Sequence, residues 1–292
     1  CGFLRDNGWL VGVSIDGPEG FHDEYRQMRL GQPSWAKVMR GIDLLNKYGV
    51  EWNAMAVVND YNADFPQEFY HFFRDELDCH YLQFTPVVER VVGKEKTGMR
   101  PRLVHLGEKE GEVTPFSVRP QQWGNFLCGV FDEWVKRDVG EYFVQLFDAT
   151  LANWMGMTPG VCTLASDCGH AAVMEFNGDV YSCDHFVFPE YKLGNIKSQS
   201  IYQLMNSPQQ QDFAHIKKGW LPRQCKECQW HFACNGECPR NRFAYTAEGE
   251  PRLNYLCSGY QHFFSHVAPY MDFMKRELLA GRPASGVMDM AL

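Results

Sequence analysis

The distribution of cysteine most strongly constrains how this chain can fold. Eight of the eleven cysteines lie in its C-terminal half, and the densest stretch has the spacing Cys-x2-Cys-x5-Cys-x3-Cys. The eight are Cys162, Cys168, Cys183, Cys225, Cys228, Cys234, Cys238 and Cys257. Cys-x2-Cys pairs let two sulfurs converge on one metal from a tight turn. Eight clustered thiolates are the number that two four-ligand metal clusters need.

Composition excludes several classes of protein. With 292 residues, 45% of them apolar and 22% charged, the chain can build one large or two ordinary domains around a sizeable core. Disulfide scaffolds are usually much smaller, so eleven cysteines here predict free thiols in a reducing cytoplasm. The net charge of -8 argues against a nucleic-acid partner, and without 18 consecutive apolar residues no membrane helix is expected. No signal peptide is recognised, and a first residue Cys1 instead of Met predicts an excised piece of a longer protein.

The first half of the chain alternates between strand and helix signals. Apolar runs of strand length occupy 10–15, 52–58 and 81–87. Helical spacing of apolar residues occupies 35–48, 65–77 and 120–139, and 143–157 is interpreted as a strand and a short helix. This alternation predicts βαβ units and a parallel sheet. The charged, glycine-rich segment 89–114 is expected to be a long loop.

The texture changes near Pro159 to cysteines, turns and short strands. Residues 173–182 predict a hairpin with its turn at Asn177-Gly178. Short helical pieces are expected at 201–205 and 212–217, and little order after Gly281.

The cysteines alone leave two kinds of metal site open, because thiolates suit both zinc and iron-sulfur clusters. A structural zinc site would use only the four cysteines of the densest stretch. The zinc interpretation leaves Cys162, Cys168, Cys183 and Cys257 without a partner, whereas two clusters use all eight. Cys1, Cys79 and Cys128 are then ordinary buried thiols.

The order Cys168-x9-Gly178-x4-Cys183, Cys-x2-Cys-x5-Cys-x3-Cys and a final Cys257 resembles the seven-cysteine motif of the SPASM domain. This domain occurs in radical S-adenosylmethionine enzymes that modify peptides. The additional Cys162 and the pair Cys183-Asp184 resemble one subgroup, the anaerobic sulfatase-maturating enzymes. The resemblance covers nearly the whole chain.

This resemblance implies two auxiliary 4Fe-4S clusters with interleaved ligands. The first would use Cys162, Cys168, Cys183 and Cys238, and the second Cys225, Cys228, Cys234 and Cys257. It also implies that Asp184 is the base that deprotonates the substrate thiol or hydroxyl. The alternative is that Asp184 is a turn residue, and the adjacent His185 is expected to be structural or to support the site.

Matches near the N-terminus imply a site for S-adenosylmethionine. The segments 13–17 and 22–26 resemble the family's fourth strand and its following loop, and 83–88 resembles the sixth strand. Ser14 and Arg26 are therefore candidates to contact this cofactor, and Val88 is a candidate to pack on its adenine. An arginine suits the cofactor's carboxylate because it binds both oxygens. Otherwise, Ser14 simply ends a buried strand and Arg26 is a surface charge.

The family's radical-initiating Cys-x3-Cys-x2-Cys loop is not found in this sequence. We therefore expect the C-terminal half of a partial (β/α)6 TIM-type barrel followed by a cysteine-rich α+β SPASM domain. The expected divisions are 1–157 for the barrel part, 158–270 for the SPASM domain and 271–292 for a tail. Without the upstream strands, an edge of the sheet would be exposed, which favours aggregation. We also expect that the chain alone does not catalyse the reaction.

The implied activity of the intact enzyme is oxidation of a sulfatase Cys or Ser to formylglycine by radical chemistry. It would bind S-adenosylmethionine at a third 4Fe-4S cluster, and its partners would be the sulfatase polypeptide and a small electron-donor protein. Three alternatives remain: another SPASM peptide maturase that forms thioether or carbon-carbon crosslinks, a zinc-stabilised binding module without catalysis, and a degenerate paralogue that binds peptide.

Overall fold

The chain forms two compact units. The computed structural model describes residues 1–93, 102–104, 111–169, 171–219 and 221–290. The first unit, here called the sheet unit, comprises Cys1–Val88, Pro115–Met157 and Ser258–Leu292. The second, called the cysteine-rich unit, comprises Glu89–Thr114 and Thr158–Cys257. Both units therefore combine segments that are distant in the sequence.

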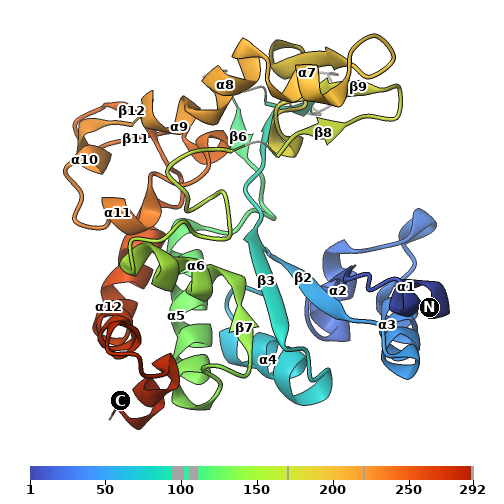
Figure 1. Cartoon of the computed structure of the whole chain (residues 1–292), viewed down its shortest axis with the longest axis vertical. Helices are drawn as coiled ribbons and strands as arrows, with labels where there is room; N and C mark the ends of the chain where they lie inside the picture. Colours follow the sequence, from blue (N-terminus) through green and yellow to red (C-terminus); the bar gives the residue numbers. More distant parts are fainter. Residues whose placement is uncertain (94–101, 105–110, 170, 220, 291–292) are drawn as a thin grey trace. The chain divides into compact units, whose positions relative to one another are not determined.

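The sheet unit contains a parallel four-stranded sheet in the order β1-β2-β3-β7 (Figure 1). Its strands are β1 (Val11–Ser14), β2 (Trp52–Val58), β3 (Tyr81–Pro86) and β7 (Phe143–Val144). The helices around them are α1 (Gly2–Asp6), α2 (Glu19–Tyr25), α3 (Trp35–Tyr48), α4 (Pro66–His71), α5 (Pro120–Arg137) and α6 (Gln145–Trp154). The predicted alternation of strands and helices is confirmed, and the last turn of the helix expected at 65–77 is a π-helix over Phe72–Glu76.

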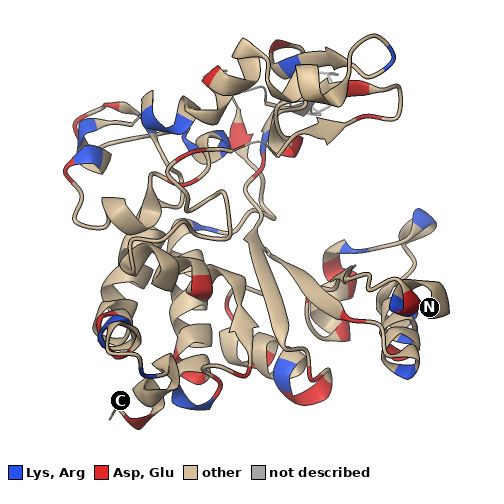
Figure 2. Cartoon of the chain, viewed as in Figure 1, with Lys and Arg blue, Asp and Glu red and all other residues tan. Residues whose placement is uncertain are grey.

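The parallel strands carry no charged residue, whereas charged residues are spread over the helices and loops (Figure 2). A parallel sheet is covered on both faces, so its strands must be apolar. In β2, Ala54, Ala56 and Val58 are buried. Helix α3 ends at Gly49, which takes the left-handed conformation with φ 62° that glycine adopts readily.

Aromatic side chains from successive elements form the core of this unit. The ring of Phe69 in α4 lies 5.3 Å from Phe73, 5.7 Å from Phe84 and 5.2 Å from Phe126, measured between centroids. Tilted and edge-to-face pairs at this separation add to the free energy gained by burial. One residue of α4 therefore joins the π-helical turn, β3 and α5.

A long helix that the sequence did not predict closes the sheet unit. Helix α12 (Cys257–Leu279) packs on α5 so closely that a Cβ on Gly259 would lie 2.1 Å from the Pro120 carbonyl oxygen. His266 Nε2 also lies 2.6 Å from Asp132 Oδ1. Residues 258–292 thus belong to the sheet unit, whereas we expected them to divide between the SPASM domain and a tail. None of the described helices combines the length and hydrophobicity needed to cross a bilayer.

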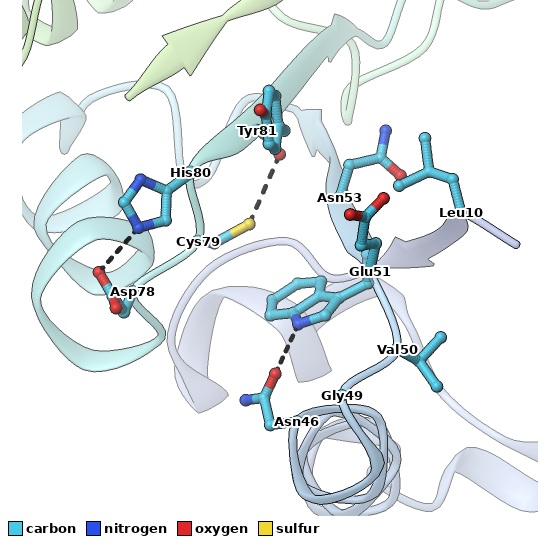
Figure 3. A pocket seen from close by; sticks show the side chains of 11 residues that line it. Leu10, Asn46, Gly49, Val50, Glu51, Asn53, Asp78, Cys79, His80 and Tyr81 are labelled. Carbon is cyan, nitrogen blue, oxygen red and sulfur yellow. Dashed lines mark hydrogen bonds and ion pairs between the residues drawn. The ribbon is translucent and has the colours of Figure 1, made fainter. Parts of the chain in front are cut away.

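A pocket of about 530 Å³ opens at the amino-terminal edge of the parallel sheet (Figure 3). It is lined by Leu10, by Trp52 at the start of β2, and by Cys79 and Tyr81 around the start of β3. None of the predicted site residues lines it. Enzymes with parallel α/β folds bind ligands at the carboxyl ends of their strands, so this edge is not the candidate site.

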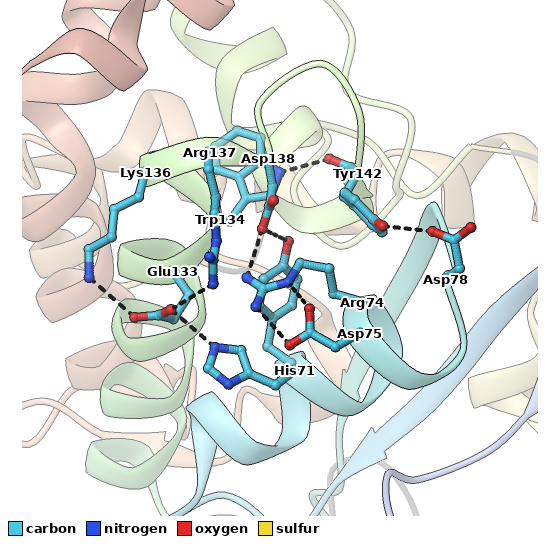
Figure 4. A network of polar contacts seen from close by, with 11 residues as sticks. His71, Arg74, Asp75, Asp78, Glu133, Trp134, Lys136, Arg137, Asp138 and Tyr142 are labelled. Carbon is cyan, nitrogen blue, oxygen red and sulfur yellow. Dashed lines mark hydrogen bonds and ion pairs between the residues drawn. The ribbon is translucent and has the colours of Figure 1, made fainter.

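Buried polar groups join the π-helical turn to the end of α5 (Figure 4). Arg74 Nη1 donates to Asp138 Oδ2 at 3.2 Å, and Tyr70 donates its hydroxyl proton to the same oxygen at 2.8 Å. Arg74 also pairs with Asp75. Because Asp138 is buried and Arg74 is its charged partner, removing Arg74 would leave a buried carboxylate without an opposite charge, which is strongly destabilising.

The cysteine-rich unit is built from short elements. Its strands are β4 (Arg90–Val92), β5 (Arg102–Leu103), β6 (Glu112–Val113), β8 (Val173–Met174), β9 (Asp179–Tyr181), β10 (Lys192–Asn195), β11 (Ala244–Tyr245) and β12 (Pro251–Leu253). Its helices are α7 (Ile201–Met205), α8 (Pro208–Ala214), α9 (Ile216–Gly219), α10 (Arg223–Lys226) and α11 (His231–Cys234). The hairpin expected at 173–182 is confirmed as β8 and β9.

The segment 89–114 differs from its expectation as a long loop. Its described residues form a small antiparallel sheet in the order β5-β4-β6. The segment also belongs to the cysteine-rich unit and not to the barrel part in which we placed it. Strands of two or three residues leave no periodic signal in a sequence, because they are stabilised by pairing with their neighbours. The parts at 94–101 and 105–110 lie outside the described residues.

Candidate functional site

The eight clustered cysteines all lie in the cysteine-rich unit, and we expect them to form two groups of four. The first thiol group is Cys162, Cys168, Cys183 and Cys238, and the second thiol group is Cys225, Cys228, Cys234 and Cys257. Packing supports the first group directly, because Cys238, Cys168 and Cys183 contact one apolar cluster around Phe186 and Phe213.

Electrostatics gives the same grouping. Burial is the main cause that raises the pKa of seven of these thiols, and neighbouring cysteines add to it at six of them. Cys162 contributes at Cys168 and Cys183, and both of these contribute at Cys238. In the second group, Cys225 contributes at Cys234 and Cys257, and Cys228 at Cys225 and Cys257. For each of the six thiols on which another cysteine acts, that cysteine belongs to the same expected group.

The turn between Cys234 and Cys238 explains how neighbouring cysteines reach different groups. Asn235, Gly236 and Glu237 all take left-handed conformations, with φ of 49°, 71° and 54°. This is rare for residues other than glycine and reverses the chain direction sharply. Cys234 therefore ends helix α11 within the second group, while Cys238 lies in the first.

The donor sets suit iron-sulfur clusters. All eight cysteines are free thiols. A 4Fe-4S cluster takes four thiolates, one on each iron. A zinc site of Cys225, Cys228, Cys234 and Cys238 would need Cys238 beside the second group, whereas it packs with Cys168 and Cys183.

Asp184 lies exposed beside the first thiol group. The Cys183 thiol donates to Asp184 Oδ1 at 3.2 Å, and a 3-10 turn begins at this residue. Partial burial works to raise the pKa of Asp184, but the bond from Cys183 and the nearby His185 outweigh it and lower that pKa. Asp184 is therefore an ionised carboxylate at neutral pH. It can accept a proton.

His185, next to Asp184, interacts with the first thiol group and with an ion pair. His185 Nδ1 lies 3.5 Å from Cys238 Sγ, and burial lowers the pKa of His185, which keeps the imidazole neutral. Arg240 and Glu89 also act on His185 and form an ion pair, in which Arg240 Nη2 donates to both Glu89 oxygens at 2.8 and 2.6 Å. Sequence reasoning missed Arg240 and Glu89. Their separation of 151 positions leaves no local signal.

The candidate cofactor residues lie in the sheet unit. Ser14 is exposed at the carboxyl end of β1, and Val88 is only 7% exposed just beyond β3. Arg26 ends helix α2, so the loop we expected at 22–26 is helical up to Tyr25. Arg26 Nε donates to Asp16 Oδ2 at 2.5 Å, and the Val57 amide donates to Asp16 Oδ1 at 2.8 Å. Buried Asp16 thus ties Arg26 to the ends of β1 and β2.

Comparisons with known proteins agree with this arrangement. The model of the SPASM family, an iron-sulfur cluster-binding domain, matches residues 167–229. A serine-type anaerobic sulfatase-maturating enzyme of Bacteroides thetaiotaomicron is 64% identical over 289 residues, which is 99% of this chain and 69% of that protein. A cysteine-type enzyme of Clostridium novyi is 31% identical over 94% of this chain and 69% of its own length. The chain belongs to the family of anaerobic sulfatase-maturating enzymes.

Solved structures of this family have the same α/β fold. Native anSMEcpe with bound AdoMet matches with a TM-score of 0.79 and 27% identity, over 94% of this chain and 70% of that one. The same enzyme with AdoMet and the Cp18Cys peptide matches with a TM-score of 0.80 and 28% identity, over 94% and 72%. The chain spans 62–69% of the length of its curated sulfatase-maturating relatives.

Proposed function

We propose that the intact protein oxidises a serine of a sulfatase polypeptide to formylglycine. The single observation that carries this proposal is the ionised, exposed Asp184 next to Cys183 of the first thiol group, in a chain of this family. The serine preference rests on the 64% identity with a serine-type relative, because relatives near 30% identity include both serine and cysteine types.

Two auxiliary 4Fe-4S clusters would be held by the two thiol groups. The first thiol group would ligate one cluster and the second thiol group the other. The fit rests on the chemistry of the donors, since each group offers four free thiols and no other ligand type is required. Such clusters supply a place for single electrons during oxidation of the substrate. A small electron-donor protein would be the redox partner.

Asp184 would remove the proton from the substrate hydroxyl. The first cluster would take Cys183 as a thiolate, so Cys183 would no longer donate a hydrogen bond to Asp184 Oδ1. That carboxylate oxygen would then be open to the substrate. Oxidation of CH₂–OH to an aldehyde releases two electrons and two protons in total. One proton and one electron leave together as the hydrogen atom from the β carbon, one proton goes to Asp184, and one electron remains for a cluster.

The sheet unit would bind S-adenosylmethionine at the carboxyl ends of its strands. We propose that it is the C-terminal half of a partial (β/α)6 barrel. This cofactor, reduced at a third 4Fe-4S cluster, supplies the radical that abstracts the β hydrogen. Arg26 would bind its carboxylate with the guanidinium nitrogens that Asp16 does not use. Ser14 would add a hydroxyl contact, and Val88 would offer a small apolar surface to the adenine.

The decisive experiment replaces Asp184 with Asn in the intact enzyme, reconstituted anaerobically. We expect turnover of a serine-containing sulfatase peptide to fall about 10²- to 10⁴-fold, as is usual on loss of a general base. Mass spectrometry of the peptide measures this turnover. Iron and sulfide contents should remain those of the unmodified enzyme. Glu190→Gln is the matched control, since this exposed carboxylate lies six positions further along the chain. Near-normal turnover by the Asp184→Asn enzyme would remove Asp184 from the mechanism.

A further inference from the structure

Three charged side chains are almost completely buried in the cysteine-rich unit. Lys217 is 1% exposed, Glu237 is 2% exposed and Arg242 is 6% exposed. Burying a charge is costly unless hydrogen bonds and opposite charges compensate for it. In the proposed function, none of the three ligates a cluster or accepts a proton from the substrate. Their contacts show what they do instead.

Lys217 organises the chain around Cys162. Its ammonium group donates to the carbonyl oxygens of Cys162, Thr163 and Ala165 at 2.9, 2.8 and 2.5 Å. These bonds use all three ammonium protons. The loop that carries Cys162 is therefore folded around one positive charge, without any bond to the thiol itself.

Arg242 organises the turn between Cys234 and Cys238. Its Nε donates to the Gly236 carbonyl at 2.8 Å, and Nη2 donates to the carbonyls of Asn235 and Glu237 at 3.1 and 2.9 Å. These are the three left-handed residues. Their carbonyls thus converge on one guanidinium. A Cβ on Gly236 would lie 2.8 Å from Arg242 Nη2, which leaves no room for another side chain.

The three charges are linked to one another and to the last ligand. Arg242 Nη1 donates to the Lys217 carbonyl at 2.8 Å. The Glu237 carboxylate accepts from the Asn254 amide at 2.6 Å, and Asn254 Oδ1 accepts from the Leu256 amide next to Cys257. The set of Lys217, Glu237 and Arg242, here called the buried charge set, therefore contacts ligand-bearing segments of both thiol groups.

The charges act unequally on the two thiol groups. Lys217 acts on Cys162, Cys168 and Cys238, all of the first group. Arg242 acts on Cys225 and Cys234 of the second group, and on Cys168 and Cys238 of the first. Glu237 acts on Cys162, Cys234 and Cys238, and so on both groups.

We propose that the buried charge set positions the ligand loops before the clusters bind and then sets the reduction potential of each cluster. This inference rests on the proposed ligand assignment. Net charge near a cluster is one of the factors that set its potential. A positive charge favours the reduced cluster, so Arg242 raises both potentials and Lys217 raises mainly that of the first cluster. Glu237 lowers both.

The test measures both potentials by redox titration followed by electron paramagnetic resonance, on the reconstituted intact enzyme. Each signal is assigned by its loss in Cys162→Ala or Cys257→Ala. We expect Lys217→Met to shift the first cluster to lower potential and leave the second in place. Arg242→Met should lower both potentials, and Glu237→Gln, which keeps its shape, should raise both. Arg223→Met is the control, because this exposed arginine lies two positions before Cys225 and its charge is screened by water.

Positioning is tested separately on the intact protein without clusters, by hydrogen exchange. Arg242→Lys keeps the charge but loses the fork, so it should leave the potentials near normal while the amides of 235–238 exchange faster. The proposal is overturned if Glu237→Gln leaves both potentials unchanged, or if Lys217→Met shifts both clusters equally. These readouts do not depend on formylglycine formation. Shifted potentials in an enzyme that makes no formylglycine would refute the proposed function and retain this inference.

Discussion

At the scale of single residues, hydrogen bonds define the protonation state of buried His22. The Asp16 amide donates to His22 Nδ1 at 3.2 Å, so that nitrogen must be an acceptor. Nε2 lies 2.9 Å from Ser34 Oγ, and Ser34 gives its own proton to the Arg26 carbonyl, so Nε2 must donate. His22 is therefore neutral, with its proton on Nε2. A second proton would break the bond from the Asp16 amide.

This tautomer predicts a loss of stability in acid. Burial lowers the pKa of His22 from its ordinary value of 6.5, although Asp16 partly opposes the shift. Below pH 6.5 the unfolded chain binds a proton that the folded chain does not, so the free energy of unfolding falls as the pH falls until the folded-state pKa is reached. Above that window His22 contributes no pH dependence. Urea unfolding at a series of pH values should show this decline, and His22→Gln should reduce it. An equal decline in His22→Gln would exclude His22 as its source.

Asp16 gives a prediction on cofactor affinity. Asp16→Asn would keep an acceptor for the Val57 amide but place an amide group beside Arg26 Nε, so the arginine would lose its orientation. Losing a charged hydrogen bond costs about 1.5–3 kcal/mol. We therefore expect the enzyme to bind S-adenosylmethionine roughly 10- to 100-fold more weakly. Calorimetry of S-adenosylmethionine binding to the intact, reconstituted enzyme measures it. Glu24→Gln, an exposed change in helix α2 two positions before Arg26, should bind normally. Equal affinities for all three proteins would contradict the role of Asp16.

The sequence predicted the candidate site only where its residues lie in or next to a motif with a characteristic spacing. Asp184 was found because it follows a motif cysteine. Lys217 and Arg242 could not be found, because a lysine or an arginine is usually solvated and their partners here are backbone carbonyls. Carbonyls carry no identity in a sequence, so only the folded chain shows that these charges are buried.

At the scale of elements, the close crossing of α5 and α12 can be tested with one methyl group. Gly259→Ala would place its Cβ 2.1 Å from the Pro120 carbonyl, and both helices must move apart. We expect a loss of about 1–3 kcal/mol in the free energy of unfolding. Gly41→Ala is the matched control in α3, since nothing lies within 4 Å of its new Cβ, and it should gain roughly 0.5–1 kcal/mol. Similar stabilities of the two variants in thermal unfolding would contradict backbone contact at this crossing.

Elements were predictable where their period is long enough to be counted. Helix α3 shows several turns of apolar spacing and a glycine stop, and it was found with its bounds. Helix α12 carries the same signal in Phe263, Val267, Met271 and Met274, which are all buried. Our expected division instead placed these residues in the SPASM domain and the tail. The signal was present, and the division of the chain was misplaced.

At the scale of the whole molecule, the two units should depend differently on metal. The cysteine-rich unit has short elements and no disulfide among its cysteines, so bound clusters would supply much of its folding free energy. The sheet unit has a parallel sheet and an aromatic core of its own. Chelation of iron should therefore increase hydrogen exchange in 158–169, 171–219 and 221–257 while β2, β3 and α5 remain protected. Equal loss of protection in both units, measured by mass spectrometry, would contradict this prediction.

The division into units was the least predictable property, because both units are discontinuous. The segment 89–114 lies between two parts of the sheet unit yet belongs with residues 158–257. Membership of a unit depends on contacts between distant segments, such as the ion pair of Glu89 with Arg240. Composition and periodicity describe neighbours along the chain and contain no such information.

The close approach of Gly259 in α12 to Pro120 in α5 also imposes an order on biosynthesis. A ribosome adds roughly 5–20 residues per second, so several seconds pass between the emergence of α5 and that of α12. During this interval the buried face of α5, with Trp123 and Phe131, has no α12 to cover it. Residues 158–257 of the cysteine-rich unit are made within the same interval. We therefore expect nascent chains halted before Gly259 to bind chaperones through α5, and to release them once α12 has emerged.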